Sequence, residues 1–290
     1  MGTPGALLIF GLGYSGAAVA RAALGAGFTV TGTSRTPDRI HAPHGVSVAD
    51  FAQAAPTIAA ATHLLSTVAP DAAGDPVLAR YGKEIAAAAS IKWLGYLSTT
   101  GVYGNRDGAW VDEDTLPAPS ADRSARRLAA EEEWRVAAGA RPLDIMRVAG
   151  IYGPGRSALD DVRAGRARRV IKPGHAFGRI HRDDIAHAVL AAMRIPPSGT
   201  RVLNLNDDEP AESADVIEEA ARLLGADAPP SVPFAQAVAG MSEMGRSFWQ
   251  ENRRVSSAKT RAALGLDWLY PSYREGLRAI LREESGQGGA

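Results

Sequence analysis

The chain has 290 residues, of which 46% are hydrophobic, so it can bury a core for one large domain or two unequal ones. Lys and Arg number 32, as do Asp and Glu, and this balance excludes a global field that would draw the protein onto nucleic acid or an anionic membrane. With no cysteine, and with six histidines that form no HxH or HxxxH pair, we expect neither disulfides nor a metal centre. The chain shows neither an apolar run of the about 18 residues that span a membrane nor a signal peptide, so we expect a cytoplasmic protein.

The first half of the chain alternates short apolar runs with Ala-rich segments, which is typical of βαβ units that build a parallel sheet. The predicted strands are Ala6–Phe10, Thr29–Thr33, Val46–Val48, His63–Thr67, Leu94–Ser98 and Leu143–Arg147. The predicted helices are Tyr14–Gly25, Pro76–Ala89 and Ser124–Ala138. This order of elements predicts a parallel sheet covered by helices.

After Gly150 the pattern changes. Gly153-Pro154-Gly155 predicts a turn, which a short basic helix follows. The segment Arg179–Asp184 opens another helix. A strand over Arg201–Leu205 and a capped helix over Pro210–Leu224 come next, and Pro229-Pro230 begins a region up to Trp268 that we expect to be rich in loops.

The first predicted strand runs into a GxGxxG motif, Gly11-Leu12-Gly13-Tyr14-Ser15-Gly16, which opens an Ala-rich helix. This placement is typical of dinucleotide-binding proteins. Gly11 permits the tight turn, Gly13 lets the backbone approach a pyrophosphate at the helix N-terminus, and Gly16 lets the helix pack close to the strand. Tyr14 and Ser15 complete the predicted cofactor loop.

The end of the second predicted strand indicates which dinucleotide is bound. About twenty residues after the first glycine, an NAD-specific site usually presents Asp or Glu to the ribose 2′-hydroxyl. Here the chain reads Thr33-Ser34-Arg35 and offers no carboxylate. Arg35 can pair with a 2′-phosphate and Ser34 can hydrogen-bond it, so the sequence predicts NADP. The alternative is that Arg35 is a solvated surface residue.

Together with the glycine motif, three further stretches resemble the extended short-chain dehydrogenase/reductases, in the branch called NAD-dependent epimerase/dehydratases. These stretches are Leu97–Gly104, Arg147–Arg156 and Arg179–Ala186. The resemblance implies that Thr99 is the Ser/Thr that hydrogen-bonds the reacting carbonyl or alcohol. It also implies positions beside the adenine for Asp50 and Phe51, and along the cofactor for Thr67, Ala69 and Pro70.

The chain departs from this family at its proton relay, the Tyr and Lys of a YxxxK motif. Alignment puts Arg123 at the Tyr position and Arg127 at the Lys position. Arginine cannot donate and accept protons near neutral pH, because its pKa exceeds about 12. We expect the two guanidinium groups, one helical turn apart, to hold a carboxylate or phosphate of an anionic substrate. The alternative is that both point to solvent or pair with Glu131 and Glu132.

Three residues are candidates to replace the relay, and each has a structural alternative. Tyr103 follows Thr99 by four residues and could reach the nicotinamide, but a tyrosine in a VYG turn is more often a packing residue. The same two interpretations hold for Tyr152. Asp75 could organise water, although its place before Pro76 favours a helix N-cap.

Several polar and aromatic residues of the second half also have two interpretations. His181 and Asp184 belong to a segment that in the family tethers the cofactor domain to the substrate lobe. Arg253 and Arg254 could close the cleft. Phe248 and Trp249 are interpreted as core or lid residues, and stacking on a base is the less favoured alternative. A basic cluster could hold a substrate diphosphate or form a solvated helix face: Arg163, Arg166, Arg168, Arg169 and Lys172.

The sequence therefore predicts an α/β fold, a Rossmann-type doubly wound parallel sheet with a smaller C-terminal substrate lobe. Residues 1–150 are expected to form an NADP-binding domain, 151–284 to complete the sheet and form the lobe, and 285–290 to be a disordered tail. The function indicated is an NADP-dependent oxidoreductase or epimerase-like enzyme of an atypical branch, acting on a polar or anionic carbonyl or sugar, nucleotide-linked forms included. The alternative is a catalytically silent NADP-binding sensor or scaffold. The expected partner is a small, anionic substrate, without nucleic acid or membrane, and no oligomeric state is predicted.

Overall fold

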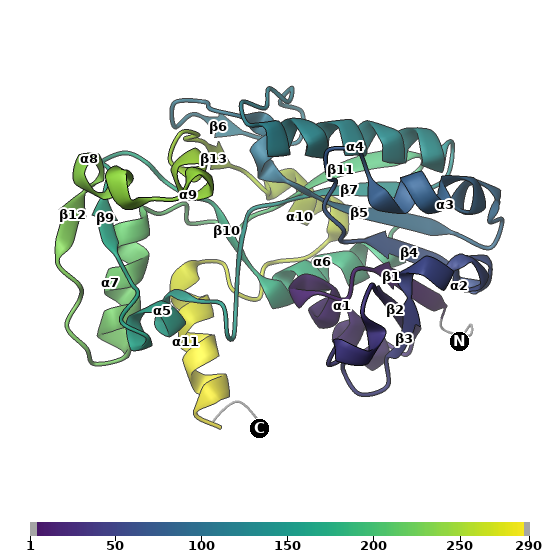
Figure 1. Cartoon of the computed structure of the whole chain (residues 1–290), viewed down its shortest axis with the longest axis horizontal. Helices are drawn as coiled ribbons and strands as arrows, with labels where there is room; N and C mark the ends of the chain where they lie inside the picture. The colour runs from purple at the N-terminus through teal and green to yellow at the C-terminus, as the bar shows by residue number, and fades with distance from the viewer. Residues whose placement is uncertain (1–4, 287–290) are drawn as a thin grey trace.

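The computed structural model describes residues 5–286, and its centre is a seven-stranded sheet in which every strand is parallel to its neighbours (Figure 1). The strand order is β11-β7-β5-β4-β1-β2-β3, so the chain builds outward in both directions from β1, as in doubly wound sheets. These strands are β1 (Ala6–Phe10), β2 (Thr29–Ser34), β3 (Ser47–Asp50), β4 (His63–Ser66), β5 (Trp93–Thr99), β7 (Leu143–Val148) and β11 (Thr200–Leu205).

Helices cover both faces of the sheet, and the alternation of side chains along β1 shows why. Leu7 and Ile9 pack with α1 (Tyr14–Gly25) and α6 (Arg182–Arg194), whereas Leu8 and Phe10 pack with the helices of the opposite face. The helices of that face are α2 (Ala55–Ala60), α3 (Pro76–Ala87) and α4 (Asp122–Ala138). Burial of strands on both faces explains their nearly continuous apolar sequences. The predicted Rossmann-type α/β fold is confirmed.

A smaller lobe lies on the left of Figure 1, beyond the carboxyl ends of the strands. Three two-stranded sheets, β10-β8, β12-β9 and β13-β6, lie outside the central sheet. Their strands are β6 (Trp110–Val111), β8 (Gly150–Tyr152), β9 (Arg169–Ile171), β10 (Arg179–His181), β12 (Ser231–Pro233) and β13 (Arg254–Val255). The remaining helices are α5 (Ala158–Arg163), α7 (Ser213–Leu223), α8 (Phe234–Ala237), α9 (Glu243–Phe248), α10 (Ala258–Leu264) and α11 (Tyr273–Glu284). Short 3-10 turns are η1 (Pro37–Arg39), η2 (Phe51–Gln53), η3 (Thr100–Tyr103) and η4 (Val238–Gly240).

The second half of the chain holds more regular structure than the sequence predicts. The region expected to be rich in loops contains elements of two to seven residues, which are too short to show a periodic pattern. The helix after the Gly-Pro-Gly turn is α5, whose first turn is acidic, and most of the basic cluster follows it. Helix α11 was not predicted. Of the expected disordered tail, residues 287–290 lie outside the described residues, whereas Ser285 and Gly286 form a turn.

The segment Arg179–Asp184 is connected to the chain that precedes α11 through hydrogen bonds from backbone N–H groups. Asp184, in the first turn of α6, is fully buried and accepts hydrogen bonds from Leu269 N (2.6 Å) and Tyr270 N (3.2 Å). His181 caps the same helix by accepting from Asp183 N (3.2 Å). These bonds fix the segment that leads into α11, which fits the structural interpretation of both residues.

Burial of Asp184 has a consequence for the pH dependence of stability. Desolvation raises the pKa of its carboxyl to about 7, while the two backbone N–H groups lower it. Because an aspartate in the unfolded chain titrates near about 3.9, the folded state binds the proton more tightly between these pH values. This contribution to stability is therefore complete below about pH 4 and lost as the pH rises to about 7.

The Asp184→Asn variant tests this expectation because it cannot titrate. The unfolding free energy of the wild type, minus that of the variant, should fall as the pH rises from about 4 to about 7. Denaturant titrations across this range measure the difference. A difference that stays constant or grows with pH would contradict the assignment.

Candidate functional site

The loop between β1 and α1 is held by two threonines from neighbouring strands. Gly11 N donates to Thr33 Oγ1 (3.3 Å), and Leu12 N donates to Thr33 O (3.1 Å). From the other side, Thr67 Oγ1 donates to Gly11 O (2.7 Å). The loop is thus fixed between the carboxyl ends of β2 and β4, which flank β1 in the sheet.

The three glycines of this loop differ in what a side chain would meet. Gly11 has φ +89°, a conformation that favours glycine, and a Cβ there would lie 2.7 Å from Thr67 Oγ1. A Cβ at Gly16 would lie 2.3 Å from Gly11 O, so this glycine permits the close packing of α1 against β1. At Gly13 a Cβ would meet nothing within 4 Å. The space over Gly13 is therefore open, as a pyrophosphate lying there would require.

The N-terminus of α1 opens onto the same space. Its N-cap, Gly13, provides no side-chain hydrogen bond, and the first turn carries no acidic residue. The free N–H groups and the helix dipole of this 12-residue helix fit a phosphate. Ser15, in this turn, is buried.

Tyr14 connects the glycine loop to the smaller lobe. Its hydroxyl donates to Pro154 O (3.1 Å). The guanidinium carbons of Arg156 and Arg182 each lie 5.6 Å from the centroid of its ring. Burial raises the pKa of this tyrosine, so its hydroxyl stays protonated. Tyr14 therefore has a positioning role between the two parts of the chain.

The residues predicted to lie beside the adenosine end gather at the edge formed by β2 and β3. Ser34 is the register partner of Asp50, and its Oγ accepts from Thr36 N (3.1 Å). Asp50 caps η2 by accepting from Ala52 N (2.8 Å), and Phe51 packs edge-on against Phe10. Arg35 is exposed and forms no ion pair with any described residue. Its guanidinium is available to an anionic ligand.

Thr99 ends β5 and caps η3, its Oγ1 accepting a hydrogen bond from Gly101 N (3.1 Å). Because this bond uses an acceptor lone pair, the hydroxyl hydrogen remains available to a substrate oxygen. Ala69 and Pro70 follow β4, the neighbouring strand, with Ala69 exposed at the same edge of the sheet. The predicted substrate-orienting and cofactor-lining residues therefore share the carboxyl edge of the sheet.

Neither arginine at the relay positions pairs with Glu131 or Glu132. Arg127 Nη1 donates to Leu97 O (2.6 Å) and Tyr96 Oη (3.2 Å), with a longer bond to Val68 O (3.4 Å). Its Nε and Nη2 have no partner among the described residues. Arg123 lies with its guanidinium carbon 3.9 Å from the ring centroid of Phe248, which α9 contributes. Phe248 is half exposed and packs over the guanidinium of Arg123, which fits its interpretation as a lid residue.

The structure corrects the catalytic assignment of Tyr103. Its side chain is fully buried, and its hydroxyl donates to Asn204 Oδ1 (2.8 Å). A hydroxyl enclosed in this way cannot exchange a proton with a substrate in the cleft. Tyr152 is also buried, and burial raises the pKa of both phenols, so the packing alternative fits both. Asp75 is the N-cap of α3, accepting from Val77 N (2.8 Å) and Leu78 N (3.0 Å).

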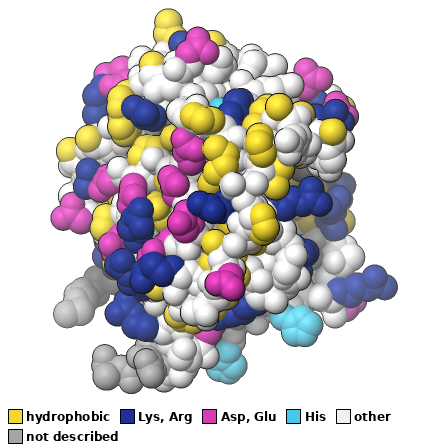
Figure 2. All heavy atoms as spheres, turned by 90° about the vertical axis from the view of Figure 1, so that its left-hand side faces the viewer, with side chains coloured by type: hydrophobic (Ala, Val, Ile, Leu, Met, Phe, Trp, Pro, Cys, Tyr) yellow, Lys and Arg dark blue, Asp and Glu magenta, His cyan; other side chains and the backbone are white. Residues whose placement is uncertain are grey.

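The basic cluster does not form one patch. Figure 2 shows Lys and Arg side chains interspersed with Asp and Glu over the face of the smaller lobe. Arg163 pairs with Glu284, Arg166 with Asp161 and Arg169 with Glu218. Lys172 donates a hydrogen bond to Trp249 O, and Arg168 is exposed. The side chain of Trp249 packs in the core of the smaller lobe. Arg253 pairs with Glu251 and donates to Gly104 O, so it connects the segment after α9 to the end of η3, whereas Arg254 is exposed.

One buried polar network escaped the sequence interpretation. Arg147 Nη2 lies 2.8 Å from Glu131 Oε2, and Ser98 Oγ donates to Glu131 Oε1 (2.6 Å). Arg147 and Ser98 are register partners on β7 and β5, and all three side chains are buried. The network fixes α4 to the sheet. The charged residue Arg147 at the end of the predicted strand Leu143–Arg147 was the available signal.

The structure offers no metal site: the described residues hold no group of three or more His, Asp or Glu placed to bind an ion. Within the described residues, no helix combines the length and the apolar composition needed to cross a membrane.

The chain is similar to several known proteins over nearly its whole length. No family model matches the chain. A functionally unknown conserved protein from Silicibacter pomeroyi DSS has 45% identity and a TM-score of 0.89, over 97% of this chain and 99% of that one. A putative NAD-dependent epimerase/dehydratase from Methylobacillus flagellatus has 24% identity and a TM-score of 0.72, over 98% and 100%. The chain has the NAD-dependent epimerase/dehydratase fold. The resemblance seen in the sequence is thereby confirmed at the level of the fold.

Two further proteins are similar to this chain. The human epimerase family protein SDR39U1 (isoform 2), solved with NADPH, has this fold at 19% identity and a TM-score of 0.72, over 95% of this chain and 98% of that one. A 3-diazoavenalumate denitrifying reductase from a Streptomyces species is 32% identical over 179 residues. That alignment spans 58% of this chain and 58% of the reductase.

Because the space over Gly13 is open, a substitution there can test whether the loop binds a dinucleotide. The Gly13→Val variant should fold but lose dinucleotide binding, because a Cβ at Gly13 meets no described atom within 4 Å and would extend into the space expected for the pyrophosphate. Calorimetric titration with NADP and NAD measures the loss. Gly82→Val is the matched control, since a Cβ at this site on α3 also meets nothing within 4 Å. Unchanged dinucleotide affinity in Gly13→Val would mean that the loop is only a turn.

Proposed function

We propose that the protein is an NADP(H)-dependent oxidoreductase of an atypical epimerase/dehydratase-like type, acting on a polar or anionic carbonyl compound or sugar, nucleotide-linked forms included. Residues 1–150 would bind the dinucleotide, and the lobe within residues 151–284 would contribute to the substrate site. The observation that carries the cofactor assignment is the exposed, unpaired guanidinium of Arg35 beside Ser34 at the end of β2.

The choice of NADP over NAD rests on charge. NAD would leave Arg35 without an anion, whereas a 2′-phosphate would give it a charge-assisted hydrogen bond and give Ser34 an acceptor. The nearby carboxylate, Asp50, already accepts a backbone hydrogen bond as the cap of η2. The NADPH in the human structure with the same fold is consistent with this choice.

The chemistry proposed for the cleft uses no tyrosine–lysine pair. NADPH supplies a hydride when bound at the carboxyl edge of the sheet. Thr99 would donate its free hydroxyl hydrogen to the substrate oxygen and so orient the reacting group. Arg123, together with Nε and Nη2 of Arg127, would hold an anionic group of the substrate. Because arginine does not titrate near neutral pH, the proton must come from the substrate or from solvent.

A second candidate function is a catalytically silent NADP-binding sensor or scaffold. The observation that favours it is the engagement of both replacement tyrosines, since Tyr103 donates to Asn204 and Tyr152 lies in the core of the smaller lobe. The Streptomyces relative is named a reductase, and this name supports the hypothesis that the present protein is also an enzyme.

Replacement of Arg35 tests the cofactor assignment. The Arg35→Ala variant should lower NADP affinity about ten- to hundred-fold, as expected for loss of a charge-assisted hydrogen bond, and leave NAD affinity unchanged. Calorimetry with both dinucleotides measures this, and Arg39→Ala, also exposed in the same loop, is the matched control. Equal affinity of the wild type for NADP and NAD, or no effect of Arg35→Ala, would remove the assignment.

Turnover of a panel of anionic carbonyl compounds and nucleotide sugars with NADPH tests the cleft. Loss of one positioned donor in Thr99→Ala should lower kcat about a hundred-fold, and Thr99→Ser should restore most of it. Arg123→Ala should instead raise KM for anionic substrates about tenfold, with Arg126→Ala as the control on the same helix. Turnover unaffected by Thr99→Ala and Arg123→Ala would exclude this site. No turnover with any compound would favour the silent protein.

A further inference from the structure

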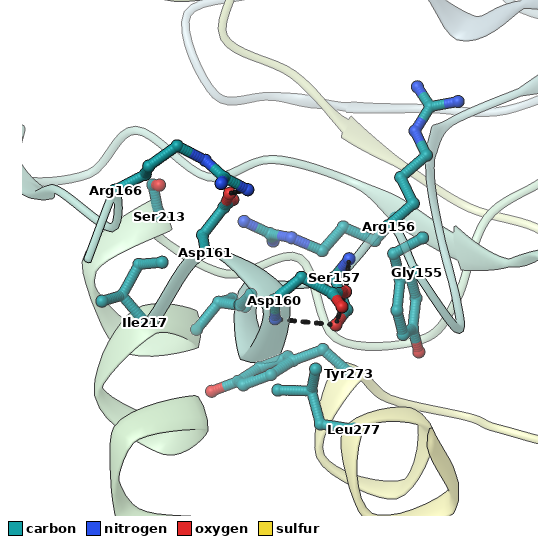
Figure 3. Close-up of a pocket in the computed structure, with 14 residues that line it drawn as sticks. Gly155, Arg156, Ser157, Asp160, Asp161, Arg166, Ser213, Ile217, Tyr273 and Leu277 are labelled. Carbon is teal, nitrogen blue, oxygen red and sulfur yellow. Dashed lines mark hydrogen bonds and ion pairs between the residues drawn. The ribbon is translucent and has the colours of Figure 1, made fainter. Parts of the chain in front are cut away.

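A cavity of about 410 Å³ lies in the smaller lobe between α5, α7 and α11 (Figure 3). The N-terminal turns of all three helices border it. Ser157 caps α5, Ser213 begins α7 and Tyr273 begins α11. The two longer helices, α7 and α11, therefore contribute N-terminal dipoles that favour negative charge at the cavity wall.

Charged side chains on the cavity wall add to this field. Three arginines line it: Arg156, Arg166 and Arg179. The two acidic residues of the wall are already engaged, because Asp160 accepts from Ser157 N (2.7 Å) and Ser157 Oγ (2.6 Å), and Asp161 pairs with Arg166. Arg156 and Arg179 form no ion pair with any described residue. Neither guanidinium group is neutralised by an ion pair, although that of Arg156 lies 5.6 Å from the ring centroid of Tyr14 and that of Arg179 interacts electrostatically with the buried Asp207.

Both arginines have N–H groups that are not used in hydrogen bonds to the described residues. Arg179 Nη1 donates to Phe177 O (2.9 Å) and Ala211 O (3.0 Å), which fixes its side chain. The buried Asp207, whose N–H donates to Arg179 O (2.7 Å), interacts electrostatically with this guanidinium, and burial raises the pKa of the Asp207 carboxyl well above its usual range. Arg156 is exposed and extends from the loop beside the cavity, as Figure 3 shows.

Tyr273 provides an independent indication of a ligand. Its side chain is 1% exposed, yet its hydroxyl has no hydrogen-bond partner among the described residues. In Figure 3 its ring lies beneath α5 and its hydroxyl points toward α7. A buried hydroxyl without a partner is rare and costs free energy, so an acceptor entering the cavity would satisfy it.

The rest of the wall is apolar. Val216 and Ile217 of α7 face Leu277 of α11 across the cavity, so a compact hydrocarbon group can be buried there. We propose that this cavity binds a small organic anion, a carboxylate or phosphate ester with a compact apolar body, through Arg156, Arg179 and Tyr273. This site goes beyond the proposed function and does not depend on it.

The cavity and the dinucleotide loop share one segment. Gly155 and Arg156 line the cavity, while Pro154, next to them, accepts the hydroxyl of Tyr14 from the glycine motif. An anion that draws Arg156 inward would act on the same loop that contacts Tyr14. Occupancy of the cavity can therefore influence dinucleotide binding without overlap of the two ligands.

The experiment is calorimetric titration of the full chain, without dinucleotide, with phenyl phosphate and with benzoate, and phenol serves as the uncharged control. At least one anion should bind and phenol should not, and the preferred anion distinguishes a phosphate ester from a carboxylate. Arg156→Ala should weaken that binding about ten- to hundred-fold and Tyr273→Phe about fivefold. Arg168→Ala, an exposed arginine outside the cavity, should leave binding unchanged.

Thermal unfolding of Tyr273→Phe separates a ligand-binding role from a structural one. Because the hydroxyl has no partner, its removal should leave the Tm of the free protein unchanged or raise it. A lowered Tm would show that the hydroxyl supports the fold instead. Absence of binding by both anions, equal binding of phenol, or unchanged affinity in Arg156→Ala and Tyr273→Phe would overturn the proposal. Competition of NADP with the bound anion would do so as well, by assigning the cavity to the dinucleotide.

Discussion

The close approach of α1 to β1 is the constraint on which the candidate site depends. A Cβ at Gly16 would lie 2.3 Å from Gly11 O, so only glycine lets the helix begin this near the strand. Thr33 and Thr67, from the strands on either side, hold the carbonyl and amide groups of the turn. The result is a helix N-terminus aimed at the carboxyl edge of a parallel sheet, where doubly wound folds bind their ligands.

A second constraint fixes the orientation of α4 on the sheet. Glu131 pairs with Arg147 in the core and accepts from Ser98, so α4 cannot rotate without exposing or unpairing a buried charge. Loss of one partner of such a pair typically costs about 3–5 kcal/mol. Arg127 and Arg123 stand one and two turns before Glu131 on the same helix face. The ion pair therefore helps to fix the orientation of the helix face that carries both guanidinium groups, for which we propose a role in substrate binding.

The sequence predicted the sheet well because buried parallel strands and the glycine loop leave strong local patterns. The strand over Ala6–Phe10 and the helix over Tyr14–Gly25 agree with the structure residue for residue. The smaller lobe was harder, since β13 spans two residues and α9 six, and their stability comes from contacts distant in the chain. Side-chain environments were not predictable either: whether Tyr103 faces the cleft or Asn204 depends on packing between segments about a hundred residues apart. The pairing of Arg123 with Phe248 belongs to the same class.

We propose that the exposed end of β2 distinguishes NADP from NAD and that the cofactor's pyrophosphate lies over the turn at Gly13. A crystal structure of the protein with NADPH tests both statements in one measurement. The account predicts the pyrophosphate over Gly13 at the N-terminus of α1, with the 2′-phosphate within hydrogen-bonding distance of Arg35 and Ser34. A 2′-phosphate that contacts neither residue, or a pyrophosphate bound away from Gly13, would contradict it.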